Sequence, residues 1–190
     1  MKRLDFLYQF TDALDLEFCD ELIQNFESSN NTLKRNDGGT PNFTELNISS
    51  HNKNLSQKVE QITKQCYDLY CHVIHPYGGF HGDFEFEGIA IKKYQSNSDD
   101  RFDDHVDVST LGSSHRFLSF LFYLNDNFTG GRTVFHPNHV VAPIKGSVLV
   151  FPPYWMYPHR GEKVDTGSKY IMSVYLNWRW IVTGKQFYLQ

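Results

Sequence analysis

The stretch Arg116-Phe-Leu-Ser-Phe-Leu-Phe-Tyr-Leu124 decides the fold class, because it is almost continuously apolar from Phe117 onward. An apolar run of this length between polar segments is typical of a β-strand that is buried on both faces. The polar, Gly-containing segment 125–131 that follows it indicates a turn. The middle of the chain therefore predicts a strand at the centre of a β core.

Further strands are expected on both sides of this run. Residues 84–94 favour a strand with a break at Gly88, and residues 168–178 favour a long final strand in which apolar side chains alternate. Three shorter candidates, separated by Gly and Pro turns, are 133–135, 140–144 and 147–151. Short strands divided in this way fit a sandwich or jelly roll.

The first 80 residues predict helices that support this core. An apolar stripe indicates a helix that Thr11 or Asp12 caps and that continues to Phe26. A second helix is expected from about 54 to 73, while the polar segment 28–50, with a turn at 37–39, is expected to be a loop. We therefore expect one mainly β domain of the α+β class over 1–190, with helical support in 1–80 and the β core in 84–180.

Composition narrows the possible classes of function. The chain has 190 residues, with 40% hydrophobic and 16% aromatic residues, and a formal net charge of −4. We expect no duplex nucleic acid and no membrane as partners, because there is no strongly basic balance and no long apolar segment. The opening residues predict no secretory signal, and three cysteines without CxxC spacing predict no disulfide framework. The expected location is the cytoplasm, and the oligomeric state stays open.

Two His-x-Asp triplets are candidates for metal binding. They are His81-Gly-Asp83, in a Gly-rich turn, and His105-Val-Asp107, which lies between strand signals. Residues i and i+2 of a strand face the same side, so a His and an Asp at this spacing can grip one ion. The strand context favours His105 and Asp107.

A third ligand must come from another strand. The candidates are His115, His136, His139 and His159. His159 is favoured because it follows the strand 147–151 and an aromatic turn that leads back toward the barrel mouth. Two imidazoles and one carboxylate on one face of an octahedron suit iron(II) and leave the opposite face open for substrate and dioxygen.

Lys169 lies ten residues after His159, early in the last predicted strand. A hairpin turn at 165–167 would place these two residues on neighbouring strands. A small dicarboxylate could then chelate the metal at one end and pair with the lysine at the other. Taken singly, a side chain of each of these types is more often an ordinary surface residue, so their order and spacing carry the prediction.

In this order the motifs resemble the 2-oxoglutarate and iron(II)-dependent oxygenases, specifically the prolyl 4-hydroxylase branch. The segment Leu14–Ile23 also resembles the opening helix of that branch. The matching motifs are Phe102-Asp-Asp-His105-Val-Asp107, Arg116-Phe-Leu-Ser-Phe-Leu-Phe-Tyr-Leu-Asn125-Asp126, Gly130-Gly131-Arg-Thr133-Val-Phe135, Gly146-Ser-Val-Leu-Val-Phe151 and the pair His159 and Lys169.

The resemblance implies a double-stranded β-helix, a jelly-roll and cupin-like fold. It implies that the catalytic metal Fe(II) is bound by His105, Asp107 and His159, and that Lys169 pairs with the distal carboxylate of 2-oxoglutarate. Cosubstrate contacts are implied for Thr133 and Tyr94, and the substrate groove for Arg116 and Tyr175. The implied reaction is hydroxylation of a peptide or protein substrate, at proline, with O2 as cosubstrate and with release of succinate and CO2. Ascorbate is a further candidate cofactor.

Several departures from the family pattern concern substrate recognition more than iron chemistry. The loop between Tyr94 and His105 is two residues longer than usual, Arg132 stands where Glu is usual, and Tyr170 and Tyr175 stand where Trp is common. A free amino acid, a small metabolite or a nucleobase therefore stays open as the substrate.

Two alternatives to this enzyme class remain. One is a non-catalytic jelly-roll module that binds a sugar or a proline-rich peptide through Tyr154, Trp155 and Tyr157, and the other is a cupin-type zinc or manganese enzyme. Segments 28–50 and 76–83 are candidate lids, because long loops in compact domains are often functional.

Overall fold

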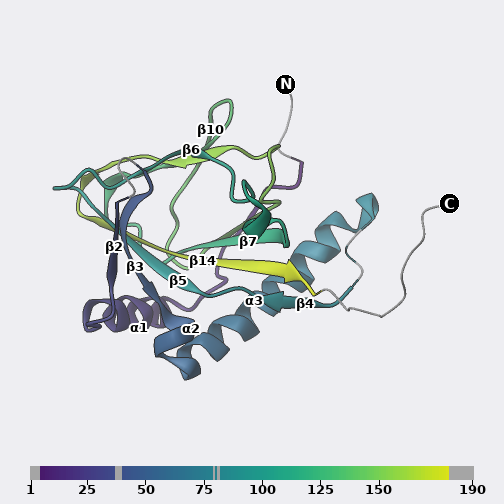
Figure 1. Cartoon of the computed structure of the whole chain (residues 1–190), viewed down its shortest axis with the longest axis horizontal. Helices are drawn as coiled ribbons and strands as arrows, with labels where there is room; N and C mark the ends of the chain where they lie inside the picture. The colour runs from purple at the N-terminus through teal and green to yellow at the C-terminus, as the bar shows by residue number, and fades with distance from the viewer. Residues whose placement is uncertain (1–4, 37–39, 79, 81, 180–190) are drawn as a thin grey trace.

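The computed structural model describes residues 5–36, 40–78, 80 and 82–179. Among these residues, the strands form an eight-stranded sheet, a four-stranded sheet that lies across one of its faces, and a two-stranded ribbon. The helices cover the other face of the large sheet (Figure 1). The predicted mainly β, jelly-roll class with supporting helices is confirmed.

Every described strand pair is antiparallel. In the large sheet, β7 and β14 are neighbours at the centre, paired from Tyr123↔Ile171 to Arg116↔Asn177. This position explains the continuous apolar run, because β7 is covered on both faces. In spatial order the large sheet contains β1 (Tyr8–Phe10), β11 (Val148–Phe151), β7 (Arg116–Tyr123), β14 (Ser168–Trp178), β5 (Ala90–Gln95), β3 (Asn42–Asn47) and β2 (Leu33–Asn36), while β4 (Phe84–Phe86) pairs with the end of β14.

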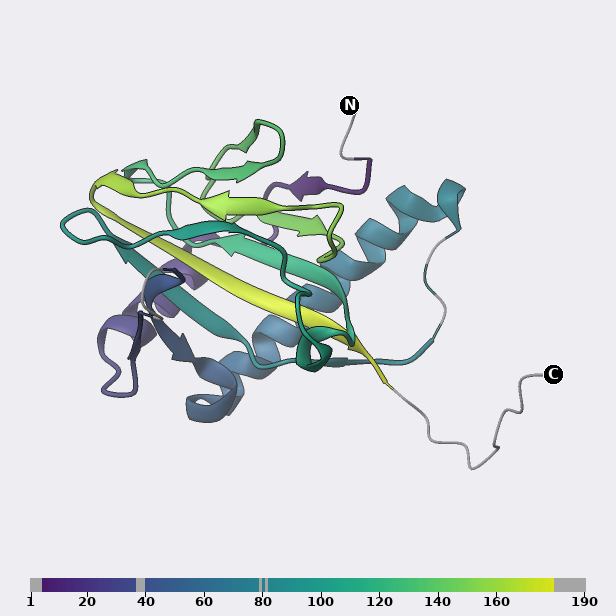
Figure 2. The same cartoon turned by 45° about the horizontal axis from the view of Figure 1, so that its top comes forward.

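The small sheet lies above the centre of the large one in the view of Figure 2. Its strands are short, and the site described below lies between it and the large sheet. The small sheet contains β10 (His139–Val141), β9 (Thr133–Phe135), β12 (His159–Gly161) and β6 (Phe102–His105), and the ribbon contains β8 (Thr129–Gly130) and β13 (Val164–Thr166).

Three α-helices support the sheet: α1 (Leu16–Glu27), α2 (Ile48–His51) and α3 (Lys53–Ile74). Two 3₁₀ turns, η1 (His75–Tyr77) and η2 (Leu111–Ser113), follow. The predicted start of the first helix at Thr11 or Asp12 is wrong, because Asp15 is its N-cap. Asp12 has φ +56°, a left-handed conformation that an N-cap residue does not adopt.

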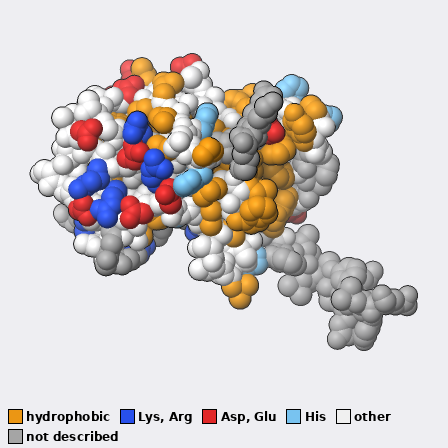
Figure 3. All heavy atoms as spheres, turned by 90° about the horizontal axis from the view of Figure 1, so that it is seen from above, with side chains coloured by type: hydrophobic (Ala, Val, Ile, Leu, Met, Phe, Trp, Pro, Cys, Tyr) orange, Lys and Arg blue, Asp and Glu red, His pale blue; other side chains and the backbone are white. Residues whose placement is uncertain are grey.

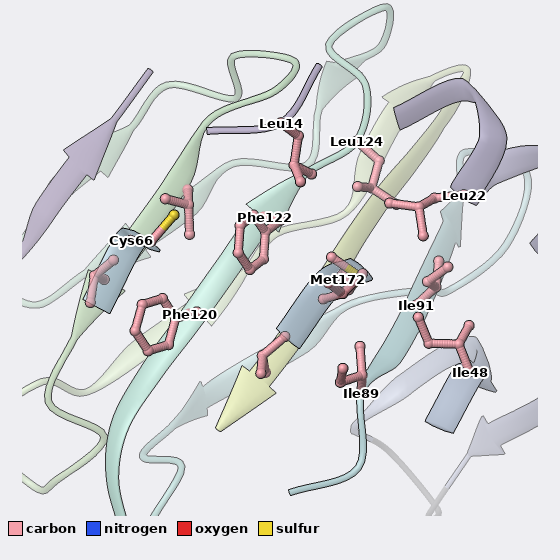
Figure 4. Packing of buried hydrophobic residues seen from close by; sticks show 14 of the residues in the cluster. Leu14, Leu22, Ile48, Cys66, Ile89, Ile91, Phe120, Phe122, Leu124 and Met172 are labelled. Carbon is pink, nitrogen blue, oxygen red and sulfur yellow. The ribbon is translucent and has the colours of Figure 1, made fainter. Parts of the chain in front are cut away.

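Alternating side chains of the central strands form the main core against the helices. Phe120, Phe122 and Met172 are fully buried there, together with Cys66 of α3 and Leu22 of α1 (Figure 4). Each large apolar side chain removed from water in this way stabilises the fold by about 1.5–3 kcal/mol. The other face of the same strands is thereby left for the site.

The expected loop over 28–50 is wrong in part, because residues 33–36 and 42–47 form the edge hairpin β2–β3 of the large sheet. The polar composition that indicated a loop reflects this edge position: β2 is exposed along its whole length, and only Phe43 and Leu46 supply apolar burial in β3, beside the buried Asn42. The expected turn at 37–39 lies outside the described residues. None of the described helices is long and apolar enough to cross a bilayer.

Replacing Phe120 with alanine should lower the free energy of unfolding by about 3–5 kcal/mol, because it leaves a cavity between β7 and the helices. Urea unfolding followed by circular dichroism measures this change. The control is Leu111→Ala, at a side chain that is 88% exposed, where the change should stay within about 0.5 kcal/mol. Equal losses in both variants would contradict this assignment of the core.

Candidate metal centre and cosubstrate pocket

Two short strands of the small sheet bring two histidines together. His105 ends β6, His159 begins β12, and the two residues are direct partners in the antiparallel register. The Nε2 atoms of His105 and His159 lie 3.7 Å and 4.0 Å from Oδ1 of Asp107. One ligand atom from each residue lies within 4.8 Å of the others, so the three side chains could hold a single metal ion.

Backbone carbonyl groups orient both imidazole rings. Nδ1 of His105 lies 2.8 Å from the carbonyl oxygen of Asp103, and Nδ1 of His159 lies 3.0 Å from that of Tyr157. A ring that donates its Nδ1–H in this way presents the Nε2 lone pair to a metal. Burial, helped by the neighbouring His159, lowers the pKa of His105 to about 4, so its ring is neutral near pH 7.

Asp107 reaches the cluster from beyond the strand, since β6 ends at His105. The predicted strand therefore does not extend to Asp107, and a shared strand face does not position its carboxylate. Instead, the hydroxyl of Tyr175 donates a 3.0 Å hydrogen bond to Asp107 Oδ1. Nη1 of Arg116 also donates to the backbone carbonyl of Asp107, at 3.0 Å.

Arg116 is itself held in place by Glu87, a residue that the sequence analysis did not single out. The guanidinium group donates to both carboxylate oxygens of Glu87, and its Nε–Oε2 distance is 2.7 Å. It also stacks over the ring of Tyr175, with 4.0 Å between the guanidinium carbon and the ring centroid. These contacts link the outer groove to Asp107, the candidate carboxylate ligand.

Lys169 lies on β14 with 2% of its surface exposed. Its ammonium group donates to the carbonyl oxygen of Gly131 at 2.7 Å and lies 3.5 Å from Oγ1 of Thr133 and 5.5 Å from the ring centre of Tyr94. Burial lowers its pKa to about 7, although Glu162 partly offsets this effect. An anion at this position would favour the protonated lysine.

A glycine is required where Lys169 meets the backbone. Gly131 has φ +57°, and an added Cβ would lie 2.9 Å from a methyl carbon of Val164. Only glycine adopts this conformation at low cost. The position of the carbonyl group that accepts the hydrogen bond from Lys169 therefore depends on a glycine at residue 131.

The expectation that His159 and Lys169 lie on neighbouring strands is wrong. His159 belongs to the small sheet and Lys169 to the large one. No hairpin turn forms at 165–167: residues 165 and 166 belong to β13, which pairs with β8, and only Gly167 separates β13 from β14. The two residues therefore face each other across the space between the sheets.

These groups line one pocket, with about 460 Å³ of empty space including the part open to solvent. The structure brings the three candidate ligands together with Tyr94, Thr133 and Lys169, as the resemblance implies, and Tyr175 joins them. Arg116 instead lines an adjoining outer groove, which Tyr175, His105 and Asp107 also line. Two further lining residues, Lys92 and Phe102, were not predicted, although Lys92 shares a strand face with Tyr94.

His81 lies outside the described residues, so the alternative triplet cannot be compared. Within the part of the chain that the structure describes, His105, Asp107 and His159 are the only group of three such side chains close enough to share an ion. Of the other histidines considered, His136 pairs with Asp104 at 2.9 Å and His139 is exposed.

Comparison with known proteins agrees with this geometry. Residues 89–177 match the model of the 2OG-Fe(II) oxygenase superfamily. No curated protein sequence is similar enough to the chain to count as a match.

Solved structures share the fold at low sequence identity. Viral collagen prolyl hydroxylase from Paramecium bursaria Chlorella virus-1, in its 2OG complex, superposes with a TM-score of 0.73 at 17% identity, over 93% of this chain and 98% of that one. A prolyl hydroxylase from Trichoplax adhaerens, in complex with a hypoxia inducible factor peptide fragment, gives 0.72 at 16%, over 92% and 84%. A Pseudomonas putida prolyl-4-hydroxylase gives 0.64 at 14%, over 91% and 92%.

The family match over residues 89–177, together with the shared fold, confirms the predicted class of 2-oxoglutarate-dependent dioxygenase. The fold is that of the prolyl hydroxylases. Enzymes of this superfamily use Fe(II), 2-oxoglutarate and O2, and the two imidazoles and one carboxylate fit Fe(II) as a donor set.

Tyr175→Phe should weaken metal binding by about 10-fold, because it removes the hydrogen bond that orients Asp107. Titration with Fe(II) without oxygen, or with Mn(II) as a stable substitute, measures the affinity. Tyr154→Phe is the matched control, because Tyr154 does not line the metal pocket. Unchanged metal affinity in Tyr175→Phe would show that the hydroxyl does not position the ligand.

Proposed function

We propose that the protein hydroxylates a peptide or protein substrate at proline, with Fe(II), 2-oxoglutarate and O2, and releases succinate and CO2. One observation carries the proposal: the cluster of His105, Asp107 and His159 shares a pocket with the buried Lys169. A metal site at one position and a buried cation at another match the two ends of 2-oxoglutarate.

In this proposal the chain binds and orients the reactants. His105, Asp107 and His159 hold the metal by one face and leave the opposite face open. Lys169 pairs with the distal carboxylate of 2-oxoglutarate, and Thr133 and Tyr94 pack around it. When bound, the iron supplies the dioxygen chemistry that protein side chains lack.

The outer groove supports an extended substrate. It contains about 1240 Å³ of empty space, open solvent included, and His105 and Asp107 line it as well as the inner pocket. A substrate in this groove would therefore lie beside the metal. The fold shared with prolyl hydroxylases, one of them bound to a peptide fragment, favours a peptide with proline as the target.

The aromatic turn 152–158 favours a non-catalytic binding module less than the metal cluster and Lys169 favour an oxygenase. Tyr157 is buried, so its ring is not available for stacking on a ligand. Trp155 is 77% exposed, and Tyr154 lines a separate apolar pocket with Tyr77 and Trp178. A surface contact at this turn would be additional to the metal site rather than a replacement for it.

His159→Ala and Asp107→Ala should each abolish succinate release and the visible Fe(II)–2-oxoglutarate absorption band under anaerobic conditions, because each removes one of three protein ligands. His139→Ala, at an exposed position of the same small sheet, should retain both signals. Full activity in either ligand variant would overturn the metal assignment. Mass spectrometry of proline-containing peptides after turnover tests the substrate, through the addition of one oxygen to proline.

Lys169→Met should weaken 2-oxoglutarate binding by roughly 10- to 100-fold, since a hydrogen bond to a charged group contributes about 1.5–3 kcal/mol. The absorption band, titrated with 2-oxoglutarate, measures this affinity. Only the protonated lysine attracts the carboxylate, and the free pKa is about 7. The difference from the unmodified protein should therefore be largest near pH 6 and should shrink as the pH rises above 7.

Lys145→Met is the control for this effect, because Lys145 pairs with Asp20 away from the pocket. An equal loss of 2-oxoglutarate affinity in both variants would argue against a specific role of Lys169.

A further inference from the structure

A second lysine faces the site from the same sheet. Along β5, Ile91 is buried in the core against the helices and Lys93 pairs with Glu27 of α1, so these side chains point to the helix side. Lys92 and Tyr94 alternate with them and line the pocket. Lys92 is opposite Ile171 of β14, two residues along the strand from the pair Tyr94↔Lys169. Two residues of a strand span about 6.6–6.8 Å, which places the two lysine backbones at different depths.

Lys92 lies where the inner pocket opens into the outer groove. It lines both spaces, whereas Lys169, Tyr94 and Thr133 line only the inner one. Its side chain is partly buried, and its ammonium group lies 5.2 Å from the ring centre of Phe43. A molecule that enters through the groove would therefore meet Lys92 next to the metal ligands.

The other cations of the groove already have partners. Arg35 binds Glu45 at 2.7 Å, and Arg116 binds Glu87 with two hydrogen bonds. On the face seen in Figure 3, basic and acidic side chains likewise lie side by side. Lys92, in contrast, forms no ion pair and no hydrogen bond through its ammonium group with any residue that the structure describes.

The charges of the proposed complex leave Lys92 uncompensated. The two positive charges of Fe(II) and the one of Lys169 are matched by the carboxylate of Asp107 and the two carboxylates of 2-oxoglutarate. Asp107 is then engaged with the metal, while Glu45 and Glu87 are engaged with arginines. A partly buried ammonium group without a counter-ion is unfavourable, and a ligand carboxylate would relieve that cost. Burial indeed lowers the pKa of Lys92, although Asp107 and Glu45 act in the opposite direction.

We propose that Lys92 binds a carboxylate of the substrate and so makes the enzyme selective for an acidic substrate. In the peptide that the proposed function requires, this group is an Asp or Glu side chain close to the hydroxylated residue. The α-carboxylate of a free amino acid has the same chemistry and is the other source. The inference rests on the proposed function for the position of the substrate, but its charge argument applies to either source.

The test uses the full chain and capped peptides that carry one proline. One set has Asp or Glu before or after the proline, and the matched set has Asn or Gln at the same positions. Free proline and other free amino acids form a third group of probes. Turnover gives kcat/KM, and fluorescence anisotropy of labelled peptides gives Kd with Mn(II) and 2-oxoglutarate in the absence of oxygen.

The unmodified protein should prefer the acidic peptides by roughly 10- to 100-fold in both kcat/KM and Kd, the usual range for a charge-assisted hydrogen bond. Lys92→Met should lose this preference, and Lys92→Arg should retain most of it. Lys92→Glu should shift the preference toward peptides with Lys or Arg beside the proline. Lys93→Met is the matched control, because the adjacent lysine faces α1, and it should keep the preference.

Three results would overturn the proposal. The first is equal binding of acidic and amide probes by the unmodified protein. The second is an acidic preference that survives in Lys92→Met. The third is a Lys92→Met variant that loses affinity for 2-oxoglutarate, measured by the absorption band, with unchanged substrate affinity, since Lys92 would then serve the cosubstrate.

Failure of the proposed function is distinguishable from these results. If free amino acids bind in a Lys92-dependent manner and no peptide does, the carboxylate inference stands while the peptide substrate is wrong. If the absorption band does not form in the unmodified protein, the oxygenase assignment fails, and the binding measurements still decide whether Lys92 selects carboxylates.

Discussion

The alternation of side chains along β14 is the constraint on which the site depends. Tyr170, Met172 and Val174 face the helices and build the core, so Lys169, Ile171, Ser173 and Tyr175 face the small sheet. The strand is paired on both sides, with β7 and with β5, and a shift by one residue would exchange the two faces. The hydrophobic core therefore holds in register the lysine and the tyrosine that serve the pocket.

The small sheet supplies the two candidate histidine ligands, His105 and His159, but little of the main core. Its strands have three or four residues, and the backbone pairing of β12 with β6 sets His159 beside His105. The rings are packed as well as paired: Phe102 stacks on His105 at 3.4 Å between ring centres, and Phe135 lies 4.9 Å from His159. Because carbonyl groups also orient both Nδ1 atoms, the cluster is pre-organised for a metal ion.

The long periodic strands were predictable from the sequence, and so were the short strands at 133–135 and 148–151, which Gly and Pro turns delimit. The apolar run of β7 and the alternation of β14 gave correct strands, because these strands are long and central in the sheet. The strand β12 contains three residues, His159–Gly161, too few to show a period, so His159 was found from its order in the chain. The hairpin β2–β3 was missed because an edge strand can be polar on both faces.

In the candidate site, too, some features were predictable from the sequence and others were not. The three candidate metal ligands line one pocket with Thr133, Lys169 and Tyr94, because motif order and spacing carry this information. That His159 and Lys169 lie on different sheets depends on the crossover through β13, which local sequence does not encode. Glu87 was not predicted because it lies beside the break at Gly88, whereas Lys92 was predictable in principle because it shares a face of β5 with Tyr94.

Tyr175 lines the outer groove and also contacts a candidate metal ligand. A side chain that only lined the groove would need no fixed partner, yet this hydroxyl donates to Asp107 and its ring stacks on Arg116. Arg116 in turn binds Glu87 and the backbone of Asp107. The carboxylate of Asp107 is therefore oriented through its side chain and its main chain by residues of the groove wall. Substitutions in that wall should therefore also disturb Asp107, the candidate metal ligand, because the same contacts hold both.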